Sequence, residues 1–341
     1  MKLGSTLVAG PGGRIRRGLL RDRAREIAAL VRDGTPACVV SSGAIALGLP
    51  RLGLERRPRS LPKLQAASAL GQVRLQAAWD AALGREGLTA AQVLLTASDV
   101  ADRGAYVNAR NTLDALLALG AVPVVNENDA TATDEITFGD NDALAAQVAV
   151  LTRARLLVLL TEVEGVYTRA PGTPGAEVIH HGSATASAVL GEGSPLGRGG
   201  MASKIVAAEL AATAGIPTVI AGGKGRDVLA SIVAGEPRGT RFHAYERSES
   251  SFKLWLRLAK PASGRLHVDE GARRAVVEEG ASLLGVGVVS VEGSFEAGDA
   301  VELVGPDGRV FAKGIAGRAA TDLARRPRRV EAVHRDRLAL Y

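Results

Sequence analysis

The sequence predicts an α/β protein with a mostly parallel central sheet, followed by a small, mainly β domain. Up to about residue 240, apolar runs of strand length alternate with longer segments of helical spacing. The strand-length runs are continuously apolar, which is typical of parallel strands covered by helices on both faces. After about residue 250, short alternating runs broken by Gly and Asp-Gly turns indicate β structure.

The apolar runs and the helical segments between them define the elements of the first domain. We expect buried strands at 37–42, 91–96, 122–128, 155–161 and 217–222, and helices at 61–83, 105–120, 141–154 and 201–215. In parallel α/β sheets, ligands bind at the carboxyl ends of the strands. The polar residues that follow these strands are therefore the candidates for a functional site.

Length and composition set the domain organisation and the compartment. We expect a first domain over 1–240, a linker over 241–251 and a small domain over 252–341. Aromatic residues make up only 3%, which argues against stacking platforms for single-stranded nucleic acid. The single Cys38 excludes an internal disulfide and fits a reducing compartment, and no apolar run approaches a membrane span. We therefore expect a cytoplasmic protein with no membrane contact.

The net charge of +6 and the sequence pI of about 9.7 are compatible with a nucleic acid or an anionic substrate. Much of the excess is Arg on predicted helical faces such as 21–33. A solvated helix face explains these residues without a ligand, and we favour it.

Two clusters of Asn and Asp stand out, Asn126–Asp129 and Asp140–Asp142. Asp140 precedes a helical segment, so helix capping explains it. The first cluster ends a buried strand, where Asn and Asp are poor strand formers and cost free energy unless they are paired. The two clusters together therefore favour a site over turn chemistry.

Other candidates involve lysine, serine and glycine. The Gly-rich segment 193–204 runs into a helix, and its N–H groups with Lys204 either bind phosphate or simply begin the helix. It matches neither GxxxxGK[ST] nor GxGxxG. Lys2 lies beside Gly4 in MKLGS, and Ser42 at a strand-to-helix turn either caps the helix or lines a site. The dispersed His and the lone Cys give no zinc signature, and GxSxG is absent.

A set of motifs follows in order along the chain: KLGS, SSGAIALG, DRGAYVNARNTLDALL, VPVVNENDATAT, FGDNDALAA, LLTEVEGVYT and GRGGMASK. Together they resemble the glutamate 5-kinases of the amino acid kinase family. The tail, with VDEGARRAVVEEGASLL and AVHRDRL, resembles a PUA domain. The resemblance implies a three-layer amino acid kinase fold with a PUA-like domain. It also implies transfer of the ATP γ-phosphate to the γ-carboxylate of L-glutamate, giving L-glutamyl 5-phosphate, the first step of proline biosynthesis.

The resemblance implies catalytic and nucleotide-binding roles at matching positions. Lys2 and Lys204 would contact the polyphosphate and neutralise the phosphoryl group in transit, and Asp142 would orient the two lysines. The nucleotide would be bound by Lys2, Thr161, Glu162, Arg198, Gly199, Gly200, Met201, Ala202, Ser203 and Lys204, with Glu162 standing where the family has Asp.

The resemblance places the glutamate site at Ser42, Asp129 and Asn141. Asp129 would pair with the substrate's α-ammonium, and Asn141 would donate to its carboxylates. A γ-carboxylate is ionised at neutral pH, with a pKa of about 4.3, so it needs no general base to act as a nucleophile. Alignment and charge neutralisation then carry the phosphoryl transfer.

The resemblance further implies ATP as co-substrate with Mg²⁺, and no metal held by protein ligands alone. It implies proline as a feedback inhibitor, glutamate-5-semialdehyde dehydrogenase as a pathway partner, and a homo-oligomer. Two alternatives stay open: another amino acid kinase, or a degenerate, non-catalytic relative that binds RNA.

Three departures from the family pattern create expectations for the structure. The family has an apolar strand before its first lysine, whereas this chain begins at Met1. Either the start is misassigned, or the first strand is largely missing, which would leave Lys2 poorly anchored. The tail is short, so we expect the small domain to lack a hairpin. The basic run 325–329 keeps RNA binding open, although a solvated patch is favoured.

Overall fold

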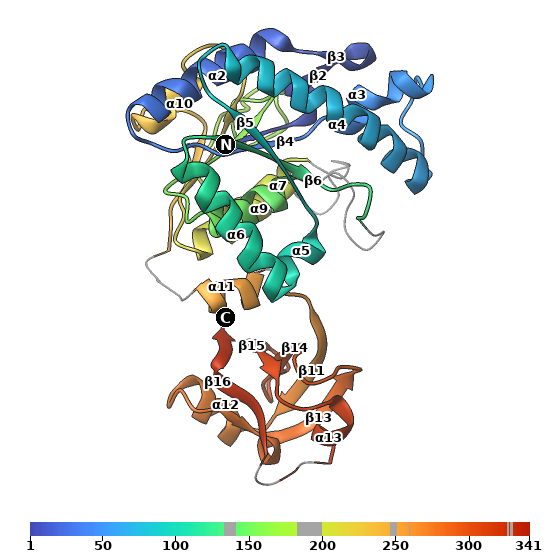
Figure 1. The fold of residues 1–341 in the computed structure, drawn as a ribbon. Helices are drawn as coiled ribbons and strands as arrows, with labels where there is room; N and C mark the ends of the chain where they lie inside the picture. The colour runs from blue at the N-terminus through green and yellow to red at the C-terminus, as the bar shows by residue number, and fades with distance from the viewer. Residues whose placement is uncertain (133–140, 183–199, 246–250, 259, 326, 328–329) are drawn as a thin grey trace. The chain divides into compact units, whose positions relative to one another are not determined.

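The computed structural model describes residues 1–132, 141–182, 200–245, 251–258, 260–325, 327 and 330–341 (Figure 1). The chain divides into two compact units, Met1–Arg247 and Ser248–Tyr341. Strand β10 (Thr240–Phe242) belongs to the sheet of the first unit, and helix α11 (Ser251–Leu258) lies in the second. The segment expected as a linker, 241–251, therefore contributes to both units.

The first unit is built on an eight-stranded sheet of order β5-β6-β4-β1-β7-β9-β10-β8. In that order the strands are Ala90–Leu95, Val122–Glu127, Val39–Ser41, Lys2–Leu3, Leu157–Thr161, Thr218–Gly222, Thr240–Phe242 and His181–Gly182. Neighbouring strands are parallel except β9 and β10. The mostly parallel sheet is confirmed, and each strand predicted from an apolar run is present.

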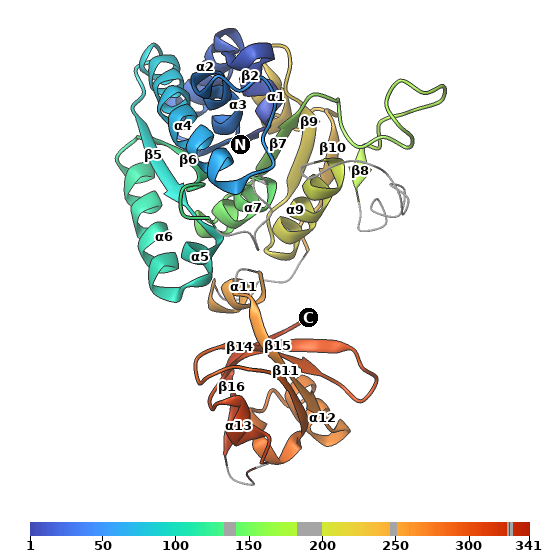
Figure 2. The same cartoon turned by 90° about the vertical axis from the view of Figure 1, so that its right-hand side faces the viewer.

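Helices cover both faces of this sheet, so the unit has three layers (Figures 1 and 2). One layer holds α2 (Arg17–Arg32), α3 (Ala44–Gly48), α4 (Leu61–Gly84) and α10 (Val228–Val233). The other holds α6 (Arg103–Ala118), α7 (Asn141–Leu151) and α9 (Met201–Thr213). The predicted helices are confirmed. Shorter elements, which show no usable period, complete the unit: α1 (Ser5–Val8), β2 (Ala9–Gly10), η1 (Pro11–Gly13), β3 (Arg14–Ile15), η2 (Leu49–Leu52) and α5 (Ala97–Ala101).

Strand β1 is short but lies in the middle of the sheet. Lys2 is in register with Val40 of β4 on one side and Leu159 of β7 on the other. Leu3 is fully buried in the core of the unit. The expectation that Lys2 is poorly anchored is therefore wrong, because pairing with both neighbouring strands fixes its backbone.

Helices α3 and α4 cross with their backbones in contact. A Cβ atom added at Gly48 would overlap the carbonyl oxygen of Ala67, and one added at Gly71 would overlap that of Ala44. Glycine at both positions permits this approach. The crossing brings the middle of α4 close to the carboxyl ends of β4 and β6, where the candidate site lies.

The second unit has its own buried core and a six-stranded sheet of order β12-β16-β15-β14-β11-β13. Its strands are β11 (Ala262–Val268), β12 (Leu283–Leu284), β13 (Val288–Gly293), β14 (Ala300–Val304), β15 (Val310–Ala316) and β16 (Glu331–Leu340), and its further helices are α12 (Glu270–Val277), η3 (Gly285–Gly287) and α13 (Ala320–Leu323). The mainly β architecture is confirmed. Helix α12 was not predicted, although Asp269 caps it by accepting the Ala272 N–H. Among the described residues of the whole chain, no helix is long and apolar enough to cross a membrane.

Candidate active site

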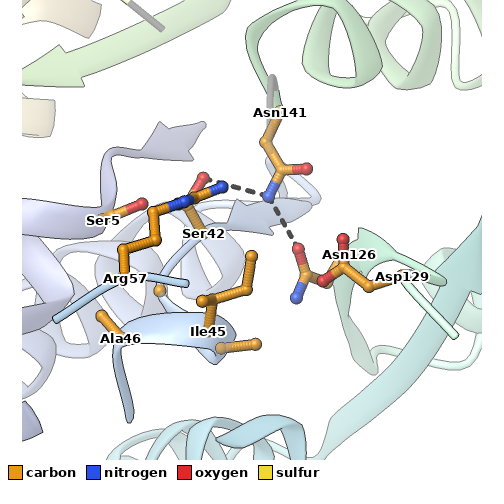
Figure 3. Close-up of a pocket in the computed structure, with 10 residues that line it drawn as sticks. Ser5, Ser42, Ile45, Ala46, Arg57, Asn126, Asp129 and Asn141 are labelled. Carbon is orange, nitrogen blue, oxygen red and sulfur yellow. Dashed lines mark hydrogen bonds between the residues drawn. The ribbon is translucent and has the colours of Figure 1, made fainter. Parts of the chain in front are cut away.

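A pocket lies where β4 and β6 end and α7 begins (Figure 3). The empty volume of the pocket, which includes space open to solvent, is about 430 Å³. It is lined by Ser5, Ser42, Gly43, Ala44, Ile45, Ala46, Arg57, Asn126, Asp129 and Asn141. The structure thus brings together the three residues expected to bind glutamate, and it adds Asn126 and Arg57 to them.

The turn after β4 places Ser42 in this pocket. Gly43 adopts a left-handed backbone with φ of 110°, which favours glycine, and it begins α3 without any side-chain cap. Ser42 therefore does not cap the helix. Its hydroxyl instead accepts a hydrogen bond from Asn141 Nδ2 at 3.0 Å. Ser42 thus lines the pocket, and its role in binding a ligand stays a prediction.

A chain of buried amides crosses the base of the pocket. Asn141 Nδ2 also donates to Asn126 Oδ1 at 2.7 Å, and Asn126 Nδ2 donates to Gln72 Oε1 at 2.7 Å. The Asn141 amide oxygen is buried and has no hydrogen-bond partner in the described part of the chain. The Nδ2 group of Asn141 therefore donates to other protein groups, and its Oδ1 atom is the acceptor available to a ligand. This is the opposite of the donor role that the resemblance implied.

Asp129 is a buried carboxylate with only part of its hydrogen-bonding capacity used. Ser68 of α4 donates to its Oδ2 atom, while its Oδ1 atom has no hydrogen-bond partner among the residues that the structure describes. Burial raises the pKa of Asp129, and the Ser68 hydrogen bond and the charge of Arg57 oppose that rise without cancelling it. Such a group gains from a cationic ligand, because an ammonium would compensate for the lost solvation.

Asp142, the next residue after Asn141, is a buried carboxylate that has its cations in place. Lys2 Nζ lies 2.5 Å from its Oδ1 atom, and Lys204 Nζ lies 3.1 Å from its Oδ2 atom. Ser203 donates to the same Oδ2 atom at 2.8 Å. Burial acts to raise the pKa of Asp142, but the two lysine charges and the hydrogen bonds outweigh it and lower the pKa. The three residues predicted to be catalytic therefore meet in one buried cluster.

The nucleotide-binding candidates lie on the strand and the helix next to this cluster. Thr161 ends β7, which pairs with β1. The next residue, Glu162, is exposed, and its Oε1 atom lies 3.8 Å from Lys224 Nζ. Gly200 precedes α9 without a side-chain cap, and its carbonyl oxygen accepts from Ser203 at 2.9 Å. Met201 and Ala202 begin α9, whereas Arg198 and Gly199, like Asp140 in the earlier cluster, lie outside the described residues.

Sequence reasoning missed Gln72, Ser68 and Arg57. Gln72 and Ser68 lie on a helix with ordinary spacing, and only the close crossing of α3 and α4 brings them to the strand ends. Arg57 comes from the exposed segment before α4. No local pattern could have identified these three residues, because their contacts join segments far apart in the chain.

Comparisons with known proteins relate the chain to two families and to several individual proteins. The model of the amino acid kinase family matches residues 1–222, and that of the PUA domain matches residues 264–335. The glutamate 5-kinase of Sphingopyxis alaskensis is 48% identical over 95% of this chain and 88% of the relative. That of Thermus thermophilus is 44% identical over 100% of this chain and 96% of the relative. A solved structure of isopentenyl phosphate kinase, 23% identical, superposes with a TM-score of 0.50 over 71% of this chain and 98% of that chain, so the two share a fold.

Proposed function

The chain belongs to the amino acid kinase family, among its glutamate 5-kinases, and we propose from this how its site works. The reaction transfers the γ-phosphate of ATP to the γ-carboxylate of L-glutamate and gives L-glutamyl 5-phosphate. The protein is therefore a phosphotransferase with a carboxyl group as acceptor, and it acts in proline biosynthesis. Residues 264–335 form its PUA domain.

The observation that carries the proposal is the position of Asn141 and Asp142 at the start of α7. Asn141 lines the pocket at the ends of β4 and β6, while Asp142 holds the two lysines. Adjacent residues thus join an amino acid pocket to a buried cationic cluster. We place the γ-carboxylate of glutamate between them, where a transferred phosphoryl group would meet Lys2 and Lys204.

Recognition of glutamate relies on the charges of the pocket. Asp129 accepts from the α-ammonium, and the oxygen of Asn141 is a second acceptor for the same group. Arg57, the cation among the described residues that line the pocket, pairs with a carboxylate of the substrate. The buried oxygens of Asp129 and Asn141 that have no donor among the described residues support this assignment, since buried acceptors gain from a donor.

Transfer depends on charge neutralisation rather than on a base. The γ-carboxylate is already ionised at neutral pH, so the site has to align it and stabilise the charge on the transferring oxygens. Lys2 and Lys204 are buried, which strengthens their interaction with that charge. Asp142 keeps these two like-charged groups together in the absence of nucleotide. Thr161, Glu162 and the segment Gly200–Lys204 hold the nucleotide in this scheme.

Magnesium enters the proposal with ATP. No three His, Cys, Asp or Glu side chains gather as a metal site in the described ranges. Mg²⁺ in kinases is commonly bound through the phosphates of the nucleotide with one or two carboxylates and water. In this proposal the ion accompanies the ATP phosphates, where it would neutralise phosphate charge.

Membership in the family supports further proposals about regulation and partners. We propose inhibition by proline, the product of the pathway, and assembly into a homo-oligomer. The acyl phosphate product is labile, so we also propose that glutamate-5-semialdehyde dehydrogenase consumes it. A cytoplasmic location is consistent with a chain that carries a single cysteine.

The proposed function is tested by glutamate-dependent formation of ADP with the full chain, ATP and Mg²⁺. Hydroxylamine traps an acyl phosphate as the hydroxamate, which identifies a carboxyl group as the acceptor. Aspartate and N-acetylglutamate are compared as acceptors under the same conditions. The proposal fails if ADP formation does not depend on glutamate, or if either of the other acceptors is clearly preferred.

A further inference from the structure

The hydrogen bonds of the amino acid pocket lead to Gln72, on the buried face of α4. Asn126 Nδ2 donates to Gln72 Oε1 at 2.7 Å, and Asn126 Oδ1 accepts from Asn141 Nδ2 at 2.7 Å. The exposed fractions of Gln72, Asn126 and Asn141 are 8%, 3% and 3%. Gln72 does not line the pocket, so any influence on a ligand passes through the two asparagines.

An amide has a donor end and an acceptor end, so its neighbours determine how it is turned. Because Gln72 offers its oxygen, the nitrogen of Asn126 points to α4 and its oxygen points to Asn141. Asn141 Nδ2 donates to Asn126, and it also lies 3.0 Å from the Ser42 hydroxyl and 3.4 Å from the Ser41 carbonyl oxygen, which can only accept. Within the part of the chain that the structure describes, the Asn141 oxygen accepts no hydrogen bond. If Gln72 offered its nitrogen instead, Asn126 would present its own nitrogen to Asn141. Asn141 could accept from it only by turning its oxygen toward the carbonyl of Ser41.

The backbone of Gln72 is tightly constrained, whereas its buried Nε2 atom has no hydrogen-bond partner among the described residues. Its neighbour Gly71 lies against the backbone of Ala44 in α3, with no room for a side chain. One helical turn earlier, Ser68 donates to Asp129, and the other oxygen of that carboxylate has no partner in the described ranges. The same face of α4 thus fixes two acceptors, on Asp129 and on Asn141, and two acceptors in one pocket match a ligand ammonium.

We propose that Gln72 is a positioning residue that sets the polarity of the amino acid site. By accepting from Asn126, it keeps the Asn141 oxygen available to the α-ammonium of the substrate. Gln72 thereby contributes to the preference for an amino acid over a dicarboxylate that lacks the amino group. This inference rests on the proposed function, since it takes glutamate as the ligand.

The test compares Gln72→Met with Gln72→Glu in the full-length protein. Methionine keeps the shape but removes the hydrogen bond, whereas the glutamate side chain keeps an acceptor oxygen. We expect Gln72→Met to raise the KM for glutamate by about tenfold or more, because a buried hydrogen-bonding group is left without its partner. The KM for ATP should stay unchanged. Gln72→Glu should retain a KM for glutamate close to that of the wild type.

Glutarate provides a readout that general damage to the structure would not give. It has both carboxylates of glutamate but no α-ammonium, so its inhibition constant reports the pocket without that contact. In Gln72→Met we expect the inhibition constant for glutarate to stay at the wild-type value while the KM for glutamate rises. Gln76→Met, one turn further along α4, is the matched control and should leave both constants unchanged.

Three results would overturn the inference: a wild-type KM for glutamate in Gln72→Met, equal impairment in Gln72→Glu and Gln72→Met, or parallel weakening of glutamate and glutarate. Thermal denaturation of each variant identifies loss of fold, and if Gln72→Met does not fold, Gln72→Glu still decides the acceptor role. A wild-type protein without glutamate-dependent activity would count against the proposed function instead.

Discussion

Asp129 and Asp142 are two buried aspartates in neighbouring parts of the site, and their surroundings act on them in opposite ways. Asp129 receives a hydrogen bond from Ser68, its other oxygen has no partner among the residues that the structure describes, and burial raises its pKa. Asp142 lies between Lys2 and Lys204, and despite its burial these charges lower its pKa. The residue type is the same, so the difference comes from which cations the fold supplies.

The contrast separates a group prepared for a ligand from a group that holds the machinery together. At Asp129 the free protein bears the cost of a buried charge, and a substrate ammonium would relieve it. At Asp142 the cost is already offset by two ammonium groups of the protein. We therefore expect changes at the two sites to separate, with binding affected at one and turnover and stability affected at the other.

The largest effect is expected at the lysine cluster around Asp142. Lys204→Ala removes a buried positive charge that faces the transferring phosphoryl group, so kcat should fall by about a thousandfold. The dissociation constant for glutamate, measured by calorimetry, should change little. Lys63→Ala, an exposed lysine of α4, is the control. Near-normal turnover in Lys204→Ala would contradict the role of the cluster.

Replacing Asp142 should reduce stability as well as turnover. Asp142→Asn leaves two buried lysines without their counter-charge, and breaking a buried pair in this way costs about 3–5 kcal/mol. The pKa of Asp142 is lower in the folded state than in the unfolded state. Ionised Asp142 therefore stabilises the fold above its unfolded-state pKa, and this stabilisation is lost as the pH falls through its folded-state pKa. Thermal melting at neutral pH should therefore give a lower Tm for Asp142→Asn than for the wild type. The control Asp80→Asn, at an exposed position of α4, should keep the wild-type Tm.

Replacing Asp129 should have the opposite effect on stability and a strong effect on binding. Its raised folded pKa means that ionisation at neutral pH opposes folding, so Asp129→Asn should keep or raise the Tm. The KM for glutamate should rise by about a hundredfold, because a charged partner of the ammonium is lost. A Tm that drops as far as in Asp142→Asn would remove the distinction between the two aspartates.

The pH dependence of the wild type should reflect Asp129 rather than Asp142. As the pH falls toward the raised pKa of Asp129, this carboxylate becomes protonated in the free protein. The value of kcat/KM for glutamate should therefore begin to decrease at a higher pH than an aspartate of ordinary pKa would cause. Asp142 stays ionised over the same range because its pKa is lowered. In a pH profile this acidic decline should disappear in Asp129→Asn, and its persistence would assign it to another group.

The alternation of apolar runs and helical segments predicted the parallel sheet, its five main strands and four of its helices. The site was located because Asn and Asp are poor strand formers and gather at the end of a buried strand. The ordered motifs, including those around Lys2 and Lys204, then indicated the family. These features are local, so the chain shows them without its fold.

Contacts across the chain decided what local patterns could not. Gln72 and Ser68 reach the site only because α3 and α4 cross at glycines, and Lys2, Asp142 and Lys204 meet only when β1, α7 and α9 pack together. The direction of each amide, and the opposite pKa shifts of two aspartates, depend on the partners that the fold brings near. The sequence by itself determined the main strands and helices of the first unit and the polar residues that end its buried strands. Only the tertiary structure decided the polarity and charge of that site, because hydrogen bonds and ion pairs depend on distance in space rather than along the chain.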